Sequence, residues 1–432
     1  MLRDHSPIWR PFTQHATADP APVIVRAEGT YLYTVDGRKI IDGIASWWVN
    51  THGHCHPKIV AAVQEQAARL DQAVFASFTH EPAERLAHEL LAVAGAPFEH
   101  VFLSDSGSTA VEAALKMAIG FWAHRGQARR KIVALDHAYH GDTFGAMAAG
   151  GRSVFNRLYE PYLFDVARLP FPRRGHEQTV LSAFERLLRD EPDNVAALIV
   201  EPLILGAGGM LIYGAETLRA LADLCRRHEG RLVADEVMTG WGRTGTRFAC
   251  EQAQVNPDIM CLSKGLTGGF LPMGATLVAP EIYQAFYHQD RGKAFYHSSS
   301  FTGNAPACAA ALASLAVWRE EPVFERIAMI AARHRQAAAH FAARGDVADA
   351  RSLGTILALD LRVTADAGGY LSPRAPELSR FFLDRGVFLR PLGNTIYVMP
   401  PYCISENDLE QIYDTIRQAL DSLIHAGTEP AL

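Results

Sequence analysis

The sequence is poor in cysteine. Its 432 residues include only six cysteines, and no two of them form a CxxC pair. Small secreted proteins that depend on disulfides are much richer in cysteine, so we expect no disulfide framework. The scattered cysteines favour a reducing compartment, and we expect the protein to be cytoplasmic.

The sequence also lacks a charge excess and an apolar segment of membrane type. Lys and Arg number 41 against 47 Asp and Glu, a net charge of −6, and no basic block occurs. Nucleic-acid and membrane partners are therefore not expected. The N-terminus has no apolar leader segment, so a secretory signal is not expected either. The most apolar stretch, Val195 to Ala215, includes Glu201 and Pro202, which a membrane span would exclude.

The sequence does contain alternating strand-like and helix-like segments, within a composition of 49% apolar and 20% charged residues that is typical of a globular protein. The alternation predicts an α/β fold with a mostly parallel sheet covered on both faces. The expected strands are Val101–Leu103, Lys131–Leu135, Val195–Val200, Arg231–Ala234, Ile259–Leu262 and Ala275–Ala279; the expected helices include Pro57–Leu70, Ser108–His124 and Glu216–His228.

The two ends of the chain differ from this middle part. Residues EGTYLYTVDGRKIID predict a β-hairpin with its turn at Asp36-Gly37, and the last ~110 residues are rich in helix with a strand-like RSLGTILALDL segment. We expect a large central domain, residues 56–320, and a smaller α+β domain that both termini build together from residues 1–55 and 321–432.

Two charged residues follow predicted strands in the central part. Lys264 stands in LSKGLTGG directly after one strand, and Asp235 ends the strand RLVADE. Ligands bind beyond the carboxyl ends of strands in open α/β sheets, and a strand-end lysine suits covalent amine chemistry. A buried carboxylate needs a cationic partner, which a protonated pyridine nitrogen would provide. Taken alone, the lysine motif is more simply explained as a surface lysine in a loop, and the acid could cap a neighbouring loop.

Two further motifs follow predicted strands. In SDSGSTAVEAALKMA, the amides of Gly107 and Ser108 would open a helix and suit a phosphate, although ordinary helix capping by Ser106 or Ser108 is the simpler explanation of this motif alone. Tyr139 in HAYHGDT could stack on a flat cofactor, or simply pack. The histidines and the cysteine of THGHCHPKI stand too close together to converge on one metal ion, so no metal is expected.

Taken together, the motifs GHCHPKI, SDSGSTAVEAALKMA, YHGDT, ADEVMTGWGRTG, LSKGLTGG and FTGN resemble those of the class III aminotransferases of fold type I. They occur in the family's order over nearly the whole chain. The resemblance implies a pyridoxal 5′-phosphate cofactor and a homodimer with shared active sites.

The resemblance also implies roles for individual residues. Lys264 would carry the cofactor covalently, Asp235 would pair with its pyridine nitrogen, and Tyr139 would lie near its ring. Gly107 and Ser108 would bind the phosphate, and HSSSFTGN would lend Ser299 and Ser300 to the phosphate in the other subunit. The residues implied in substrate binding are Phe12, Trp47, Trp48, Tyr139, Ser298 and Arg390.

The motifs IWRPFTQ, SWWVN and LRPLGNTIYVMPPY are rarer in this family. They resemble members of biotin biosynthesis that aminate 8-amino-7-oxononanoate with S-adenosylmethionine as the donor. Phe12 stands where such members often have tyrosine, and HSSSF replaces a common HGPTF, so lysine also stays open as the donor. The shared family motifs also fit a transaminase of ω-amino acids or diamines, a pyridoxal-phosphate racemase or aminomutase and, less well, a non-catalytic relative.

Overall fold

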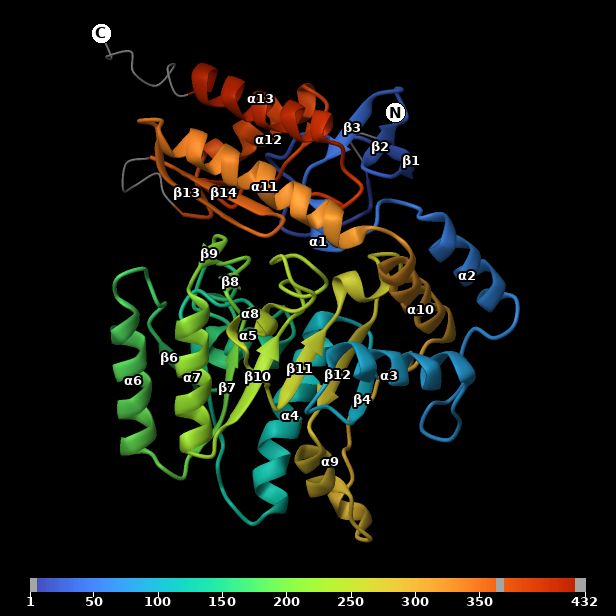
Figure 1. The fold of residues 1–432 in the computed structure, drawn as a ribbon, viewed down its shortest axis with the longest axis vertical. Coiled ribbons are helices and arrows are strands. Elements are labelled where there is room, and N and C mark those ends of the chain that lie inside the picture. The colour runs from blue at the N-terminus through green and yellow to red at the C-terminus, as the bar shows by residue number, and fades with distance from the viewer. Residues whose placement is uncertain (1–5, 363–368, 424–432) are drawn as a thin grey trace.

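The computed structural model describes residues 6–362 and 369–423. Its largest sheet has seven strands in the order β4-β12-β11-β10-β7-β5-β6 (Figure 1). Every neighbouring pair from β11 to β6 is parallel, whereas β12 is antiparallel to both β4 and β11. The strands are β4 (His100–Ser104), β5 (Lys131–Leu135), β6 (Val166–Leu169), β7 (Val195–Val200), β10 (Arg231–Asp235), β11 (Ile259–Leu262) and β12 (Gly274–Val278).

Helices cover both faces of this sheet because successive strand residues point to opposite faces. In β5, Ile132 packs in one buried cluster with helix α4, whereas Val133 packs in another with α6 and α7. The helices of this part are α2 (Pro57–Ala67), α3 (Glu81–Ala94), α4 (Gly107–His124), α5 (Phe144–Ala149), α6 (Glu177–Asp190), α7 (Ala215–Arg227), α8 (Ala249–Ala253), α9 (Pro280–Phe286) and α10 (Ala305–Glu320). Strands β8 (Ile204–Leu205) and β9 (Leu211–Ile212) form a separate small hairpin.

Two smaller sheets contain the terminal segments, which lie above the large sheet in Figure 1. In one, the order is β1-β2-β3-β15, and β15 from the C-terminal part is parallel to β3; the other has the order β13-β14-β16. The elements are β1 (Ile24–Glu28), β2 (Tyr31–Thr34), β3 (Lys39–Asp42), α11 (Val323–Ala342), β13 (Val347–Leu353), β14 (Ile356–Leu361), α12 (Arg374–Asp384), β15 (Val387–Phe388), β16 (Thr395–Val398) and α13 (Glu406–Leu423).

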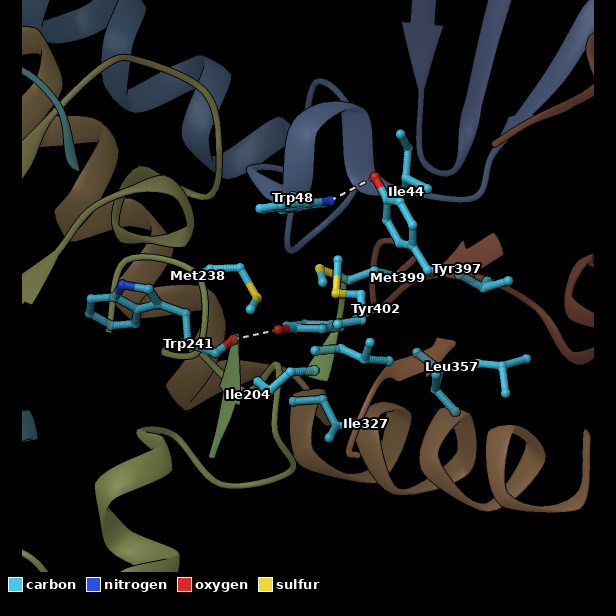
Figure 2. Packing of buried hydrophobic residues seen from close by; sticks show 14 of the residues in the cluster. Ile44, Trp48, Ile204, Met238, Trp241, Ile327, Leu357, Tyr397, Met399 and Tyr402 are labelled. Carbon is cyan, nitrogen blue, oxygen red and sulfur yellow. Dashed lines mark hydrogen bonds between the residues drawn. The ribbon is translucent and has the colours of Figure 1, made fainter. Parts of the chain in front are cut away.

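One buried cluster joins the terminal segments to the central part of the chain, and Figure 2 shows a portion of it. Trp48 donates its indole N–H to the Tyr397 hydroxyl at 2.9 Å, and the Tyr402 hydroxyl donates to the carbonyl of Trp241. Met238 and Met399 fill space in the same cluster, as flexible thioethers do in irregular gaps. The region around Trp48 therefore belongs to one packed interior.

The expected α/β class is confirmed, with three local differences. Strand β6 was not expected, and the segment RSLGTILALDL belongs to two strands of a hairpin, β13 and β14, because Gly354 adopts a left-handed turn conformation with φ of +54°. The antiparallel β12 also departs from a parallel sheet. The hairpin of β2 and β3 and the six expected central strands occur within one or two residues of their expected bounds. The domain boundaries at residues 55 and 320 stay a prediction.

Helices long and apolar enough to cross a membrane do not occur among residues 6–362 and 369–423.

Candidate active site

Asp235 and Lys264 stand at the carboxyl ends of two adjacent strands. Asp235 is the last residue of β10, and it lies beside Cys261 of the parallel strand β11. Lys264 follows β11 directly after Ser263, with a left-handed φ of +47° that is costly for a residue with a side chain. Burial lowers the pKa of the Lys264 amine despite the opposing charges of Asp235 and Glu201. The neutral, nucleophilic amine is thereby favoured.

Asp235 is buried and held by two donors. Its Oδ1 accepts the backbone N–H of Val237 at 3.1 Å, and its Oδ2 lies 2.7 Å from Nδ1 of His140. Burial acts to lower the pKa of His140, but the hydrogen bond and charge of Asp235, helped by Glu201, raise it overall. The carboxylate therefore has a fixed orientation at the strand end.

The N-terminus of α4 lies nearby, after strand β4. Ser106 is its N-cap: the Ser106 hydroxyl accepts from the N–H of Thr109, and the Thr109 hydroxyl accepts from the N–H of Ser106. The expected capping therefore exists, and it leaves the first-turn amides of Gly107 and Ser108 without partners inside the helix. A side chain at position 107 would come within 2.6 Å of Val237 Cγ1, so this close approach requires glycine.

An aromatic cavity of about 330 Å³ opens above Lys264. Phe12 lies 5.5 Å from Trp47 and 5.6 Å from Phe155, and Phe155 lies 4.5 Å from Tyr370, measured between ring centres. The Lys264 Nζ lies 5.2 Å from the centre of a Trp48 ring. The lining residues are Phe12, Trp47, Trp48, Val49, Tyr139, Asp142, Phe155, Ala207, Lys264, Tyr370, Arg390, Leu392 and Tyr397.

The tryptophan pair lies in a strained turn, α1 (Ala45–Trp48), that a buried acid holds. Ala45, Ser46 and Trp48 all have positive φ, between 51° and 66°. The carboxylate of Asp42 accepts from the backbone N–H of Ser46 at 2.6 Å and of Ile44 at 3.2 Å. These hydrogen bonds offset the strain, and so the two rings reach the cavity from adjacent positions.

Arg390 brings a positive charge to the same cavity. Its guanidinium carbon lies 5.2 Å from the centre of a Trp47 ring, and it donates to the carbonyl of Phe12 at 3.2 Å. Among residues 6–362 and 369–423, no carboxylate forms an ion pair with it. The parallel N–H donors of its guanidinium group are therefore available to the carboxylate of a bound ligand.

Six of the residues expected from the sequence line one cavity: Lys264, Tyr139, Phe12, Trp47, Trp48 and Arg390. Asp235 at the end of β10, and Gly107 and Ser108 at the start of α4, lie outside its lining but at the same end of the sheet. Ser298, Ser299 and Ser300 do not line it within one chain, and they lie in an exposed or half-exposed segment before α10. The histidines of THGHCHPKI have separate partners: His52 bonds with Ser314, His54 with Asp42 and His56 with Glu321.

Several residues of the site were not expected from the sequence. Asp142, Phe155, Tyr370 and Tyr397 line the cavity from loops and from β16, where no periodic pattern marks them. His140 did carry a signal, since it directly follows Tyr139 after a predicted strand. The Tyr139 phenol stays neutral, because burial and the nearby Asp142 raise its pKa well above the usual value.

These features fit pyridoxal 5′-phosphate. A buried amine of lowered pKa suits attachment of an aldehyde, a buried carboxylate suits a protonated ring nitrogen, and helix N-terminal amides suit a phosphate. The required groups lie at the ends of β4, β10 and β11 and meet at one end of the sheet.

Comparison with known proteins gives consistent results. The family described as aminotransferase class III matches residues 13–420. Adenosylmethionine-8-amino-7-oxononanoate aminotransferase of Synechococcus elongatus is 44% identical over 98% of this chain and 100% of its own length. The enzyme of the same name from Nitratidesulfovibrio vulgaris is 40% identical, over 99% of this chain and 83% of its own length.

Solved structures agree with the sequence comparisons. The crystal structure of adenosylmethionine-8-amino-7-oxononanoate aminotransferase from Methanocaldococcus jannaschii superposes with a TM-score of 0.89 at 32% identity, and the match covers 95% of this chain and 97% of that one. An amine transaminase from an uncultivated Pseudomonas species, in its pyridoxal-phosphate-bound form, gives a TM-score of 0.91 at 29% identity, covering 96% and 99%. The fold, the site and these matches together assign the chain to the class III aminotransferases.

Proposed function

We propose that the protein transfers an amino group from S-adenosylmethionine to 8-amino-7-oxononanoate and so forms 7,8-diaminononanoate in biotin biosynthesis, with pyridoxal 5′-phosphate as cofactor. A relative named adenosylmethionine-8-amino-7-oxononanoate aminotransferase is 44% identical over 98% of this chain. The geometric observation that carries the proposal is the aromatic cavity lined by both Lys264 and Arg390, whose guanidinium pairs with no carboxylate among the residues that the structure describes. The scattered free cysteines support a cytoplasmic location.

The cofactor, when bound, supplies the electron sink that makes removal of the donor's α-proton feasible. In this proposal Lys264 would hold the cofactor and, as a free amine, would move the proton at the substrate carbon. Asp235 would hold the proton on the ring nitrogen, and the amides of Gly107 and Ser108 would bind the phosphate. Tyr139 and the tryptophans exclude water from the reacting atoms.

Both substrates suit the same cavity. Trp47 and Trp48 offer flat faces that attract a sulfonium cation, and the same faces suit the apolar chain of the keto acid. Each substrate also has a carboxylate that Arg390 can bind with two parallel hydrogen bonds. Amine transaminases share this fold at 29% identity, so the fold alone does not distinguish substrates.

We also propose a homodimer in which each chain completes the other's site. Ser299 and Ser300 would bind the phosphate held by the partner, and Ser298 would approach its substrate. The support is that these serines lie outside the cavity of their own chain, in a segment where Phe301 is 62% exposed. Tyr296 in the same segment is 70% exposed, and grouped exposed apolar residues are typical of surfaces that a second chain covers.

Arg390→Ala is expected to lower kcat/KM in both half-reactions by on the order of 10²-fold, because the carboxylate of each substrate loses its charged partner. Arg390→Lys keeps the charge but loses the planar fork, so it should recover only part of the loss. Stopped-flow measurement of each half-reaction checks this expectation. An Arg390→Ala enzyme that is impaired toward neither substrate would refute the role of this residue and the observation that carries the proposal.

A further inference from the structure

Two buried titratable residues behind Asp235 have no role in the proposed reaction. Glu201 follows β7 and His140 lies beyond the end of β5, and β10, β7 and β5 are consecutive neighbours in the sheet. The carboxyl ends of parallel neighbours meet at one edge, which is where ligands bind in such sheets. His140 and Glu201 are each 3% exposed, so their charges are not screened by water.

His140 has Asp235 as its partner. Its Nδ1 lies 2.7 Å from Oδ2 of Asp235, whereas its buried Nε2 has no hydrogen-bond partner among the described residues. With Nδ1 as the donor, His140 satisfies one oxygen of a carboxylate that is itself 3% exposed. Without that donor, Oδ2 of the buried carboxylate would lose its side-chain hydrogen bond, and the orientation of Asp235 would no longer be fixed on that side.

Glu201 holds the segment that carries His140. Its Oε1 accepts the backbone N–H of Tyr139 at 2.8 Å, and its Oε2 accepts the backbone N–H of Gly206 at 2.9 Å. One carboxylate thus connects the loop that carries Tyr139 and His140 to the loop that contributes Ala207 to the cavity wall. Burial, together with the charge of Asp235, raises the pKa of Glu201 to about 7, while the charge of His140 and the two backbone donors oppose the rise.

We propose that His140 and Glu201 are positioning residues for the cofactor: Glu201 fixes the Tyr139–His140 backbone, and His140 holds the Asp235 carboxylate in the orientation that faces the ring nitrogen. Supporting residues of this kind set the orientation and basicity of the groups that touch a ligand. The inference rests on the proposed function, since it concerns the same cofactor. The charged groups that face Asp235 are His140, Glu201 and Lys264.

The test compares four variants with the wild type. His140→Leu removes the donor at similar size, whereas His140→Asn keeps an N–H donor near the position of Nδ1. Glu201→Gln keeps one acceptor but turns an amide N–H₂ toward a backbone N–H. Glu236→Gln is the matched control: Glu236 is fully buried next to Asp235 and accepts two backbone N–H groups, those of Ala249 and Cys250, but it holds α8.

Two readouts do not depend on turnover. The first is the dissociation constant of pyridoxal 5′-phosphate from the cofactor-free enzyme, and the second is the pH midpoint of the absorbance change of the Lys264-bound cofactor. In His140→Leu we expect roughly tenfold weaker binding of the cofactor and a pH midpoint higher by about one unit. The midpoint should rise because a less positive ring favours protonation of the Lys264 nitrogen that joins the cofactor to the protein. We expect His140→Asn to recover most of both effects, Glu201→Gln to show a smaller shift in the same direction, and Glu236→Gln to match the wild type.

The inference is overturned if His140→Leu has the wild-type midpoint and affinity, or if Glu236→Gln shifts both as much as Glu201→Gln does. If His140→Leu does not fold, the comparison of Glu201→Gln with Glu236→Gln decides by the same criterion. The proposed function has a test of its own: a wild-type enzyme that binds the cofactor at Lys264 but transfers no amino group to 8-amino-7-oxononanoate would overturn that function and leave this inference standing. A wild-type chain that does not bind the cofactor at Lys264 would overturn both.

Discussion

Lys264→Ala is expected to abolish turnover, with a loss on the order of 10⁴-fold or more, because one amine serves as both the attachment point and the base. The residue lies at the end of β11 in a buried environment that lowers its pKa. The variant should still bind pyridoxal 5′-phosphate, but reduction with borohydride should no longer fix the cofactor to the protein.

The control for this variant is Lys58→Ala. Lys58 is an exposed lysine that pairs with Glu320 on the surface, so its loss should change neither activity nor labelling. Peptide mapping after borohydride reduction of the wild type should recover the cofactor on the peptide that contains Lys264. Recovery on any other lysine would contradict the assignment.

Asp235→Asn is expected to lower the rate of proton transfer by on the order of 10²-fold or more. The amide has nearly the same shape but no charge to hold the proton on the ring nitrogen, so the electron sink weakens in a site from which water is excluded. The loss should appear in kcat for both half-reactions, because both pass through the same charge distribution. Rapid-mixing kinetics with each substrate measures it.

A near-normal rate in Asp235→Asn would remove Asp235 from the reaction. Glu236→Gln is the appropriate comparison, since Glu236 is the adjacent buried acid and holds a helix rather than the site. If both variants lose activity equally, the effect is structural and the role of Asp235 is not supported.

The sequence predicted the residues that follow strands. Asp235, Lys264 and Gly107 stand beside strands that are almost uniformly apolar, and the rule that ligands bind at strand ends applies before strand order is known. Their meeting in one site follows from the parallel arrangement of β10 and β11 and from the place of β4 in the same sheet. The residues proposed to attach the cofactor and to bind its phosphate could therefore be proposed from local patterns alone.

The walls of the cavity could not be predicted in this way. Phe155 and Tyr370 come from loops, and Tyr397 comes from a strand of another sheet, so their approach depends on tertiary packing. The strained turn at Trp47 and Trp48 depends on Asp42, whose carboxylate acts through backbone hydrogen bonds that no motif indicates. The relation of His140 and Glu201 to Asp235 requires the order β10-β7-β5, which differs from the order along the chain.

The most direct test of the proposed function is a pair of single-turnover reactions with purified holoenzyme. The enzyme is mixed in turn with S-adenosylmethionine, lysine, ornithine and β-alanine while the absorbance of the Lys264-bound cofactor is followed, and the aminated enzyme is then mixed with 8-amino-7-oxononanoate. We expect S-adenosylmethionine to discharge the absorbance and the keto acid to restore it with formation of 7,8-diaminononanoate. If lysine discharges the absorbance and S-adenosylmethionine does not, the assignment of the donor is contradicted. Failure of the keto acid to restore the absorbance would contradict the proposed function.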